Sequence, residues 1–194
     1  FAKEMNNLRY IAARLAFDKV DAQEIRNTVD ALIDAGTYSD EFLVIIESNP
    51  PTLRDILTPF QTYLERIGVR IPDKETAVWQ IIYHHVSMIV AGAIKPLDGL
   101  KRLIADIYWD YDFHKPTKKY LGDSHGIEHL IGWYWGHDDM LERPTEVSCN
   151  GKCGEEGLRE LDKEIVKSSK EWMNNFANKA IEAIGGPRPP QPHG

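Results

Sequence analysis

This chain is organised around the segment Gly122-Asp-Ser-His-Gly-Ile-Glu-His-Leu-Ile-Gly-Trp-Tyr-Trp-Gly-His-Asp-Asp139. Four glycines, three histidines, two tryptophans and four acidic residues are concentrated here. The segment is predicted to begin a helix at Asp123 or Ser124, because both are good N-cap residues. Its apolar residues recur at helical spacing, and they are Ile127, Leu130, Ile131, Tyr134 and Trp135. The sequence therefore predicts a helix over 123–139 with one buried face.

Three glycines interrupt this predicted helix, at positions 126, 132 and 136. A glycine inside a helix costs about 1 kcal/mol relative to alanine, because it loses more backbone entropy on folding. We therefore expect another backbone or a ligand to come close to these positions. The sequence leaves both alternatives open.

Helical spacing of apolar residues also dominates the rest of the chain. Asp21-Ala-Gln-Glu24 is a capping box that starts the second of two helices within 1–36, and Gly36 ends it. Further helices are predicted over about 39–48, 52–67, 73–91, 96–108 and 155–184. Pro59 is expected to kink or restart its helix. No segment alternates convincingly between apolar and polar residues, so little or no strand is expected.

These patterns predict an all-α fold with about seven to eight helices in stacked antiparallel hairpins and a long C-terminal helix. The chain of 194 residues fits one α-helical domain over 1–184. The remaining segment, 185–194, is rich in glycine and proline and is predicted to be a flexible tail.

The net charge of -7 and the isoelectric point near 5.5 argue against a nucleic-acid partner, because no basic patch is evident. No apolar run reaches the roughly 18 to 20 residues that span a membrane, and no secretory signal opens the chain. We therefore expect a cytoplasmic protein, while the start at Phe1 leaves a preceding targeting signal open. The two cysteines are too few for a disulfide scaffold.

Acidic residues are concentrated after the histidine-rich segment, with nine acids and four bases over 136–164. Aromatic residues, including Phe113 and Trp135, lie in the same part of the chain. Aromatic anchors with surrounding charge of one sign are typical of a protein interface that attracts an oppositely charged partner. The predicted partner-binding residues are Trp109, Asp110, Tyr111, Asp112, Trp133, His137, Asp138, Asp139 and Glu142.

Metal chemistry is the alternative. His125-Gly-Ile-Glu-His129 matches the five-residue H-x-x-E-H pattern of inverted zinc peptidases. Two histidines four residues apart on one helix face can share a zinc ion, and Glu128 would act as general base. The third ligand would come from one of Glu155, Glu156, Glu160 and Glu164, with nothing to single one out.

Two other metal sites can be drawn from the same segment. His125 and His129 with Cys149 and Cys153 would give the donor set of a structural zinc site. In the other, the pair His137-Asp138 would bind a divalent cation as in helical phosphohydrolases. Its further ligands would be His84 or His85 and Asp110 or Asp123. His85 is in phase with apolar neighbours, however, and is better interpreted as a core histidine with hydrogen-bond partners.

The favoured hypothesis is an acidic helical module that binds a basic protein, and not an enzyme. An immunity-type protein that neutralises a basic bacterial toxin is one form of it. The alternative is a metal-dependent hydrolase, with zinc as cofactor, that uses the helix over 123–139. The identity of the partner or substrate, the oligomeric state and the redox state of Cys149 and Cys153 stay open.

Overall fold

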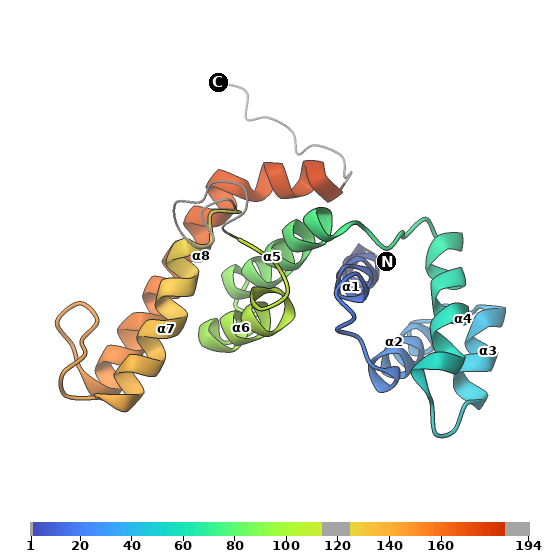
Figure 1. The fold of residues 1–194 in the computed structure, drawn as a ribbon, viewed down its shortest axis with the longest axis horizontal. Coiled ribbons are helices and arrows are strands. Elements are labelled where there is room, and N and C mark those ends of the chain that lie inside the picture. Colours follow the sequence, from blue (N-terminus) through green and yellow to red (C-terminus); the bar gives the residue numbers. More distant parts are fainter. Residues whose placement is uncertain (1, 114–124, 185–194) are drawn as a thin grey trace. The chain divides into compact units, whose positions relative to one another are not determined.

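The computed structural model describes residues 2–113 and 125–184, and within these ranges its regular structure is helical (Figure 1). The elements are α1 (Ala2–Leu15), α2 (Ala22–Asp34), α3 (Asp40–Glu47), α4 (Leu53–Arg66), α5 (Lys74–Val90), α6 (Pro96–Leu103), the π-helical turn η1 (Ile104–Tyr108), α7 (Glu128–Glu142) and α8 (Gly154–Ile184). The described residues contain a single isolated β-bridge, between Cys149 and Lys152. The predicted all-α fold with its long C-terminal helix is confirmed.

The chain divides into two compact units, with the boundary between Ala77 and Val78 inside α5. Unit 1 holds α1 to α4 and the start of α5, and unit 2 holds the remainder of α5 and the helices that follow. The interpretation of 1–184 as one domain stays a prediction. The predicted flexible tail over 185–194 lies outside the described residues.

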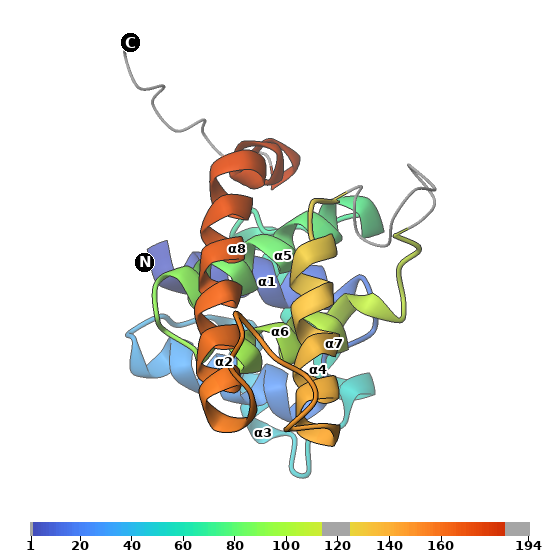
Figure 2. The same ribbon diagram turned by 90° about the vertical axis from the view of Figure 1, so that its left-hand side faces the viewer.

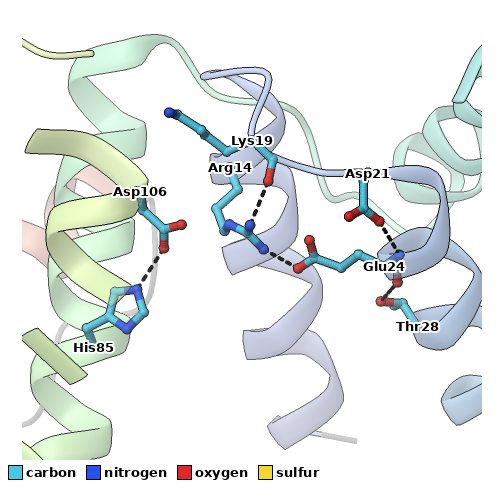
Figure 3. A network of polar contacts seen from close by, with 7 residues as sticks. All are labelled: Arg14, Lys19, Asp21, Glu24, Thr28, His85 and Asp106. Atoms are coloured by element: carbon cyan, nitrogen blue, oxygen red, sulfur yellow. Dashed lines mark hydrogen bonds and ion pairs between the residues drawn. The ribbon is translucent and has the colours of Figure 1, made fainter. Parts of the chain in front are cut away.

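In unit 1, Asp21 is the N-cap of α2, as the predicted capping box requires, whereas the Glu24 side chain of that pattern pairs with Arg14 (Figure 3). The side chain of Asp21 accepts a hydrogen bond from the Glu24 amide at 2.7 Å. Arg14 of α1 then donates to the Glu24 carboxylate and, at 2.6 Å, to the carbonyl oxygen of Lys19. One arginine therefore fastens the end of α1 to the start of α2. Gly36 follows α2 with φ of 83°, as a glycine at this C-terminal position should.

A continuous hydrophobic core fills unit 1. Its buried members are Leu8, Ile11, Ala12, Val20, Ile25, Val29, Leu32, Phe42, Ile45, Ile56, Phe60, Tyr63, Leu64 and Val69. Full burial of each large apolar side chain contributes roughly 1.5–3 kcal/mol relative to exposure, before chain entropy is subtracted. Helices α2, α3 and α4 pack against one another around this core, and α4 continues through Pro59 without restarting.

In unit 2, α7 and α8 pack side by side, and α6 packs against both. Figure 2 shows the segment 143–153, which joins α7 to α8, doubling back along the two helices. The apolar face of α5 is buried as predicted, with Val78, Ile81, Ile82, Val86 and Ile89 at most 2% exposed.

The predicted core histidine of unit 2 is confirmed. His85 is 2% exposed, and its Nε2 atom lies 2.8 Å from Oδ2 of Asp106 in η1 (Figure 3). Asp106 is itself buried. A π-helical turn holds more residues than an α-helical turn, so it changes which side chains face inward. In η1 the side chain that faces inward is the carboxylate of Asp106.

Helix α7 begins at Glu128, so the prediction that it begins at Asp123 or Ser124 is wrong. Gly126 has φ of 69°, which a right-handed helix does not allow. The close packing beside it explains the glycine, because a Cβ atom at this position would lie 2.2 Å from Cε2 of Phe176. His125 is held just before the turn, where its carbonyl oxygen accepts a hydrogen bond from Trp172 Nε1 at 2.7 Å.

Candidate functional site

Two exposed tryptophans from different elements of unit 2 lie next to each other. Trp109, directly after η1, is 70% exposed, and Trp135 on α7 is 39% exposed. Their ring centroids are 6.5 Å apart, and Tyr108 lies 4.6 Å from the first and 6.2 Å from the second. Tyr134 adds a ring 5.0 Å from Trp135. We call these four side chains the tryptophan patch.

Carboxylates continue the same side of α7. Asp138, Asp139 and Glu142 follow Trp135 at three, four and seven residues, which places them on one helix face. The side chains of Asp138 and Asp139 are 46% and 55% exposed, and Glu142 is exposed. Asp139 makes an ion pair of 3.3 Å with Arg143, but this pair is exposed and therefore weak. We call these three residues the acidic face.

The sequence placed both Tyr134 and Trp135 on the predicted buried face, although it also counted Trp135 among the aromatic residues of a possible interface. It did not single out Tyr108 or Tyr134 as interface residues. The sequence feature that could have identified Trp135 as a surface residue is its spacing from Asp138, Asp139 and Glu142. This spacing fits a helix face as well as its spacing from the apolar residues does.

Two predicted interface residues of α7 point inward instead. Trp133 is half-buried, and its Nε1 atom donates a hydrogen bond of 2.9 Å to Ser168 Oγ on α8. His137 is 8% exposed, and its Nδ1 atom lies 3.4 Å from Oδ1 of Asp138. His137 is therefore buried, whereas Trp133 is covered only in part and also borders the groove described below.

The segment after η1 is divided in the same way. Asp110 and Asp112 are exposed, as an interface with a basic partner requires. Tyr111, by contrast, packs with its ring centroid 5.0 Å from Phe113 and 5.4 Å from His125. The alternation leaves the two carboxylates outside and directs the tyrosine toward the buried aromatic residues.

A groove opens beside the acidic face, bounded by α7, α8 and the segment that joins them. Its volume is about 330 Å³, and it is lined by Glu128, His129, Gly132, Trp133, Gly136, Met140, Val147, Ser148, Cys149 and Leu161. A Cβ atom at Gly132 would meet no atom within 4 Å, and one at Gly136 would meet only Leu161, at 3.8 Å. These two glycines border open space. Only Gly126 of the three is explained by close packing.

A smaller hollow of about 200 Å³ shares Glu128 and His129 with the groove. Its other lining residues are Gly126, Leu130, Ser168, Glu171, Trp172, Asn175 and Phe176. Glu128 is therefore common to both spaces. Its Oε2 atom is buried and accepts no hydrogen bond from any residue that the structure describes.

The residues of the two predicted zinc sites are not brought together. His125 precedes α7 and is 1% exposed, with its ring 4.6 Å from that of Trp79, whereas His129 is exposed on the helix. The two histidines therefore do not share one helix face, and the geometry assumed for the H-x-x-E-H pattern is wrong. Cys149 lines the groove with His129, but Cys153 is exposed.

The residues of the third predicted metal site are not brought together among the described residues either. His137 contacts Asp138, but His85 bonds to Asp106, and Asp123 lies outside the described residues. Within 2–113 and 125–184, no group of three or more histidine, cysteine, aspartate or glutamate side chains is arranged to hold a metal ion.

Charged contacts fasten the segment 143–153 to α8. Lys152 pairs with Glu156 and Glu160 at 3.2 and 3.1 Å. Hydrogen bonds from Lys163 and then Lys152 lower the pKa of Glu160 to about 2. Burial raises the pKa of the nearby Cys149 thiol, and the carboxylates of Glu164 and Glu160 raise it further. The wall of the groove is therefore held by ion pairs, and two carboxylates lie near its thiol.

None of the helices in the described ranges is long and apolar enough to cross a membrane. Comparisons of the chain with protein-family models, with curated proteins and with solved structures find no match.

Proposed function

We propose that this protein is a binding module that recognises a basic protein partner through the tryptophan patch and the acidic face of α7. The observation that carries the proposal is the contact between Trp109 and Trp135. These two large aromatic side chains come from different elements, lie next to each other and are both exposed. Tryptophan is the residue most enriched among the energetic centres of protein interfaces. Two of them side by side on a surface supply the apolar centre that such an interface needs.

The charges around the tryptophan patch support a partner with positive charge. Asp138, Asp139 and Glu142 lie on the helix face of Trp135, and Asp110 follows Trp109 directly. Carboxylates at the rim of an interface attract a basic partner and speed its association. The net charge of -7 acts in the same direction over longer distances and disfavours binding to phosphate backbones.

An immunity-type protein that neutralises a basic bacterial toxin is the concrete form of this proposal. A nuclease toxin presents a basic, substrate-binding surface, and an acidic surface with aromatic anchors would occupy it. Size and charge support this form: the chain has 194 residues and 30 acidic against 23 basic side chains.

The test is surface plasmon resonance against a panel of basic nuclease domains and a matched panel of acidic proteins, at low and at high salt. We expect a basic domain to bind, with association that slows as salt rises. Trp135→Ala should weaken this binding by about 2 kcal/mol or more, as truncation of a central aromatic anchor does. Asp138→Lys with Asp139→Lys should slow association and flatten its salt dependence.

The control is Asp34→Lys with Glu47→Lys, which makes the same charge change at two exposed positions of unit 1. This control should bind as the wild type does, apart from a small effect of net charge. Binding that ignores both Trp135→Ala and the α7 charge reversal would overturn the proposal. So would metal-dependent turnover by a protein that binds no basic domain.

A further inference from the structure

The groove beside the acidic face contains open space that the packing of the helices does not require. Gly132 and Gly136 lie four residues apart on α7, so they face the same side. Each costs the helix about 1 kcal/mol relative to alanine. Since a Cβ atom would fit at both positions, the helix packing does not explain this cost. The glycines keep the groove open.

An acidic residue, Glu128, belongs to the lining of the groove. Glu128 Oε2 is buried and accepts no hydrogen bond from any described residue. A buried polar atom without a partner costs about 1–3 kcal/mol, and a charged one costs more. The residues that line the groove include this carboxylate but neither lysine nor arginine. Among the described residues that line the groove, Glu128 is therefore the one carboxylate, and no lysine or arginine offsets its charge.

The remaining walls fit a hydrocarbon chain. Met140, Val147 and Leu161 supply apolar surface, and the ring of Trp133 borders the same space. Aromatic rings attract cations over their faces. The buried Cys149 lies at the wall, where the carboxylates of Glu164 and Glu160 help to raise the pKa of its thiol. An apolar channel with a carboxylate in its lining matches the side chains of arginine and lysine, which have apolar stems and cationic heads.

The groove is also continuous with the proposed interface. Gly132 and Trp135 are three residues apart on α7, as are Gly136 and Asp139, so each pair is adjacent on the helix surface. A partner docked on the tryptophan patch and the acidic face would lie over the opening.

We infer that the groove receives one arginine or lysine side chain of the basic partner, whose cationic head pairs with Glu128. This inference rests on the proposed function, and it adds a specific pocket to a surface otherwise defined by charge and aromatic area. A guanidinium group can form two parallel hydrogen bonds with a carboxylate, which would make the contact geometrically specific.

The test uses butylguanidinium as probe and butylurea, which is nearly isosteric but neutral, as its control. Binding is followed by the indole N–H signals of the five tryptophans in a nitrogen–proton correlation spectrum, with Trp133 assigned from Trp133→Phe. We expect butylguanidinium to shift the Trp133 signal saturably, with a dissociation constant on the order of 1 mM for so small a ligand. Butylurea should bind at least tenfold more weakly.

Two variants test the two parts of the site. Glu128→Gln should weaken butylguanidinium binding at least tenfold, whereas Glu146→Gln, at an exposed residue outside the groove lining, should not. Gly132→Leu should abolish binding by filling the groove, while circular dichroism shows the helices intact. Equal binding of the two probes, or equal binding by wild type and Glu128→Gln, would overturn the inference.

The outcome separates this inference from the proposed function. If the probe does not bind while Trp135→Ala still weakens a basic partner, the groove inference fails and the proposed function stands. If the probe binds but Trp135→Ala and the α7 charge reversal leave partner binding unchanged, the proposed function fails and the groove remains a site for small organic cations. If both hold, Glu128→Gln should weaken the basic partner as well.

Discussion

His85 and Asp106 form a buried hydrogen bond between α5 and the π-helical turn η1, with 2.8 Å between Nε2 and Oδ2. Because the two side chains are only 3% and 9% exposed, neither can readily exchange its partner for bulk water. We expect Asp106→Ala to lower the free energy of unfolding by about 1–3 kcal/mol, since it deprives a buried imidazole of this contact. Urea denaturation followed by circular dichroism measures the change.

The control for this prediction is Asp30→Ala. Asp30 makes an ion pair with Arg26 at 3.3 Å, but its side chain is 53% exposed, so its loss should change stability by about 0.5 kcal/mol or less. A loss for Asp106→Ala no larger than that of the control would contradict the proposed importance of the buried pair.

The glycines of the α7 region should respond in opposite directions to alanine. Gly126→Ala should destabilise the fold, because φ of 69° disfavours a side chain and a Cβ atom would lie 2.2 Å from Phe176 Cε2. Gly132→Ala should instead stabilise it by up to about 1 kcal/mol, because the position is helical and no atom lies within 4 Å of the added methyl group. Thermal unfolding of the two variants beside the wild type tests both signs, and equal shifts would show that the two glycines are alike.

Acid should loosen the contacts that fasten the segment 143–153 to α8. Hydrogen bonds from Lys163 and Lys152 lower the pKa of Glu160 from 4.5 to about 2. A lowered pKa in the folded state means that the ionised carboxylate stabilises the fold above the unfolded-state pKa. This stabilisation is lost as the pH falls from about 4.5 toward 2. The difference in melting temperature between wild type and Glu160→Gln should therefore be largest at neutral pH and should vanish as the pH approaches about 2.

Glu155→Gln is the matched control on the same helix, because its side chain is 90% exposed and its ion pair with Arg159 spans 3.4 Å. This variant should melt like the wild type throughout the acid range. A difference between wild type and Glu160→Gln that stays constant with pH would assign the effect to packing and not to the charge of Glu160.

The helices were predictable where local chemistry determines them. Asp21 accepts the hydrogen bond expected of an N-cap, and Gly36 adopts the left-handed conformation expected after a helix. The start of α7 was not predictable, because the conformation of Gly126 depends on Phe176, which lies fifty residues later in the chain. Local spacing carries no information about such a distant contact.

The surface site was predicted only in part for a similar reason. Periodicity identifies two sides of a helix, but the position of neighbouring elements decides which side is covered. The indole of Trp133 donates a hydrogen bond to Ser168 of α8, whereas the ring of Trp135 packs beside the exposed ring of Trp109. Trp133 and Trp135 therefore have different roles. Because both are tryptophans, the sequence alone does not show which of them is on the surface.

The position of Trp172 imposes an order on folding during synthesis. Its ring lies 6.4 Å from that of Trp79 on α5, and its Nε1 atom donates a hydrogen bond to the carbonyl oxygen of His125, just before α7. Both contacts can form only after α8 has been synthesised. The core of unit 1, by contrast, is complete by Val69. Unit 1 can therefore close while the ribosome is still translating unit 2. Until α8 emerges, Trp79 in the nascent chain lacks its contacts with Trp172 and Phe176, which makes this interval the one in which a chaperone would be needed.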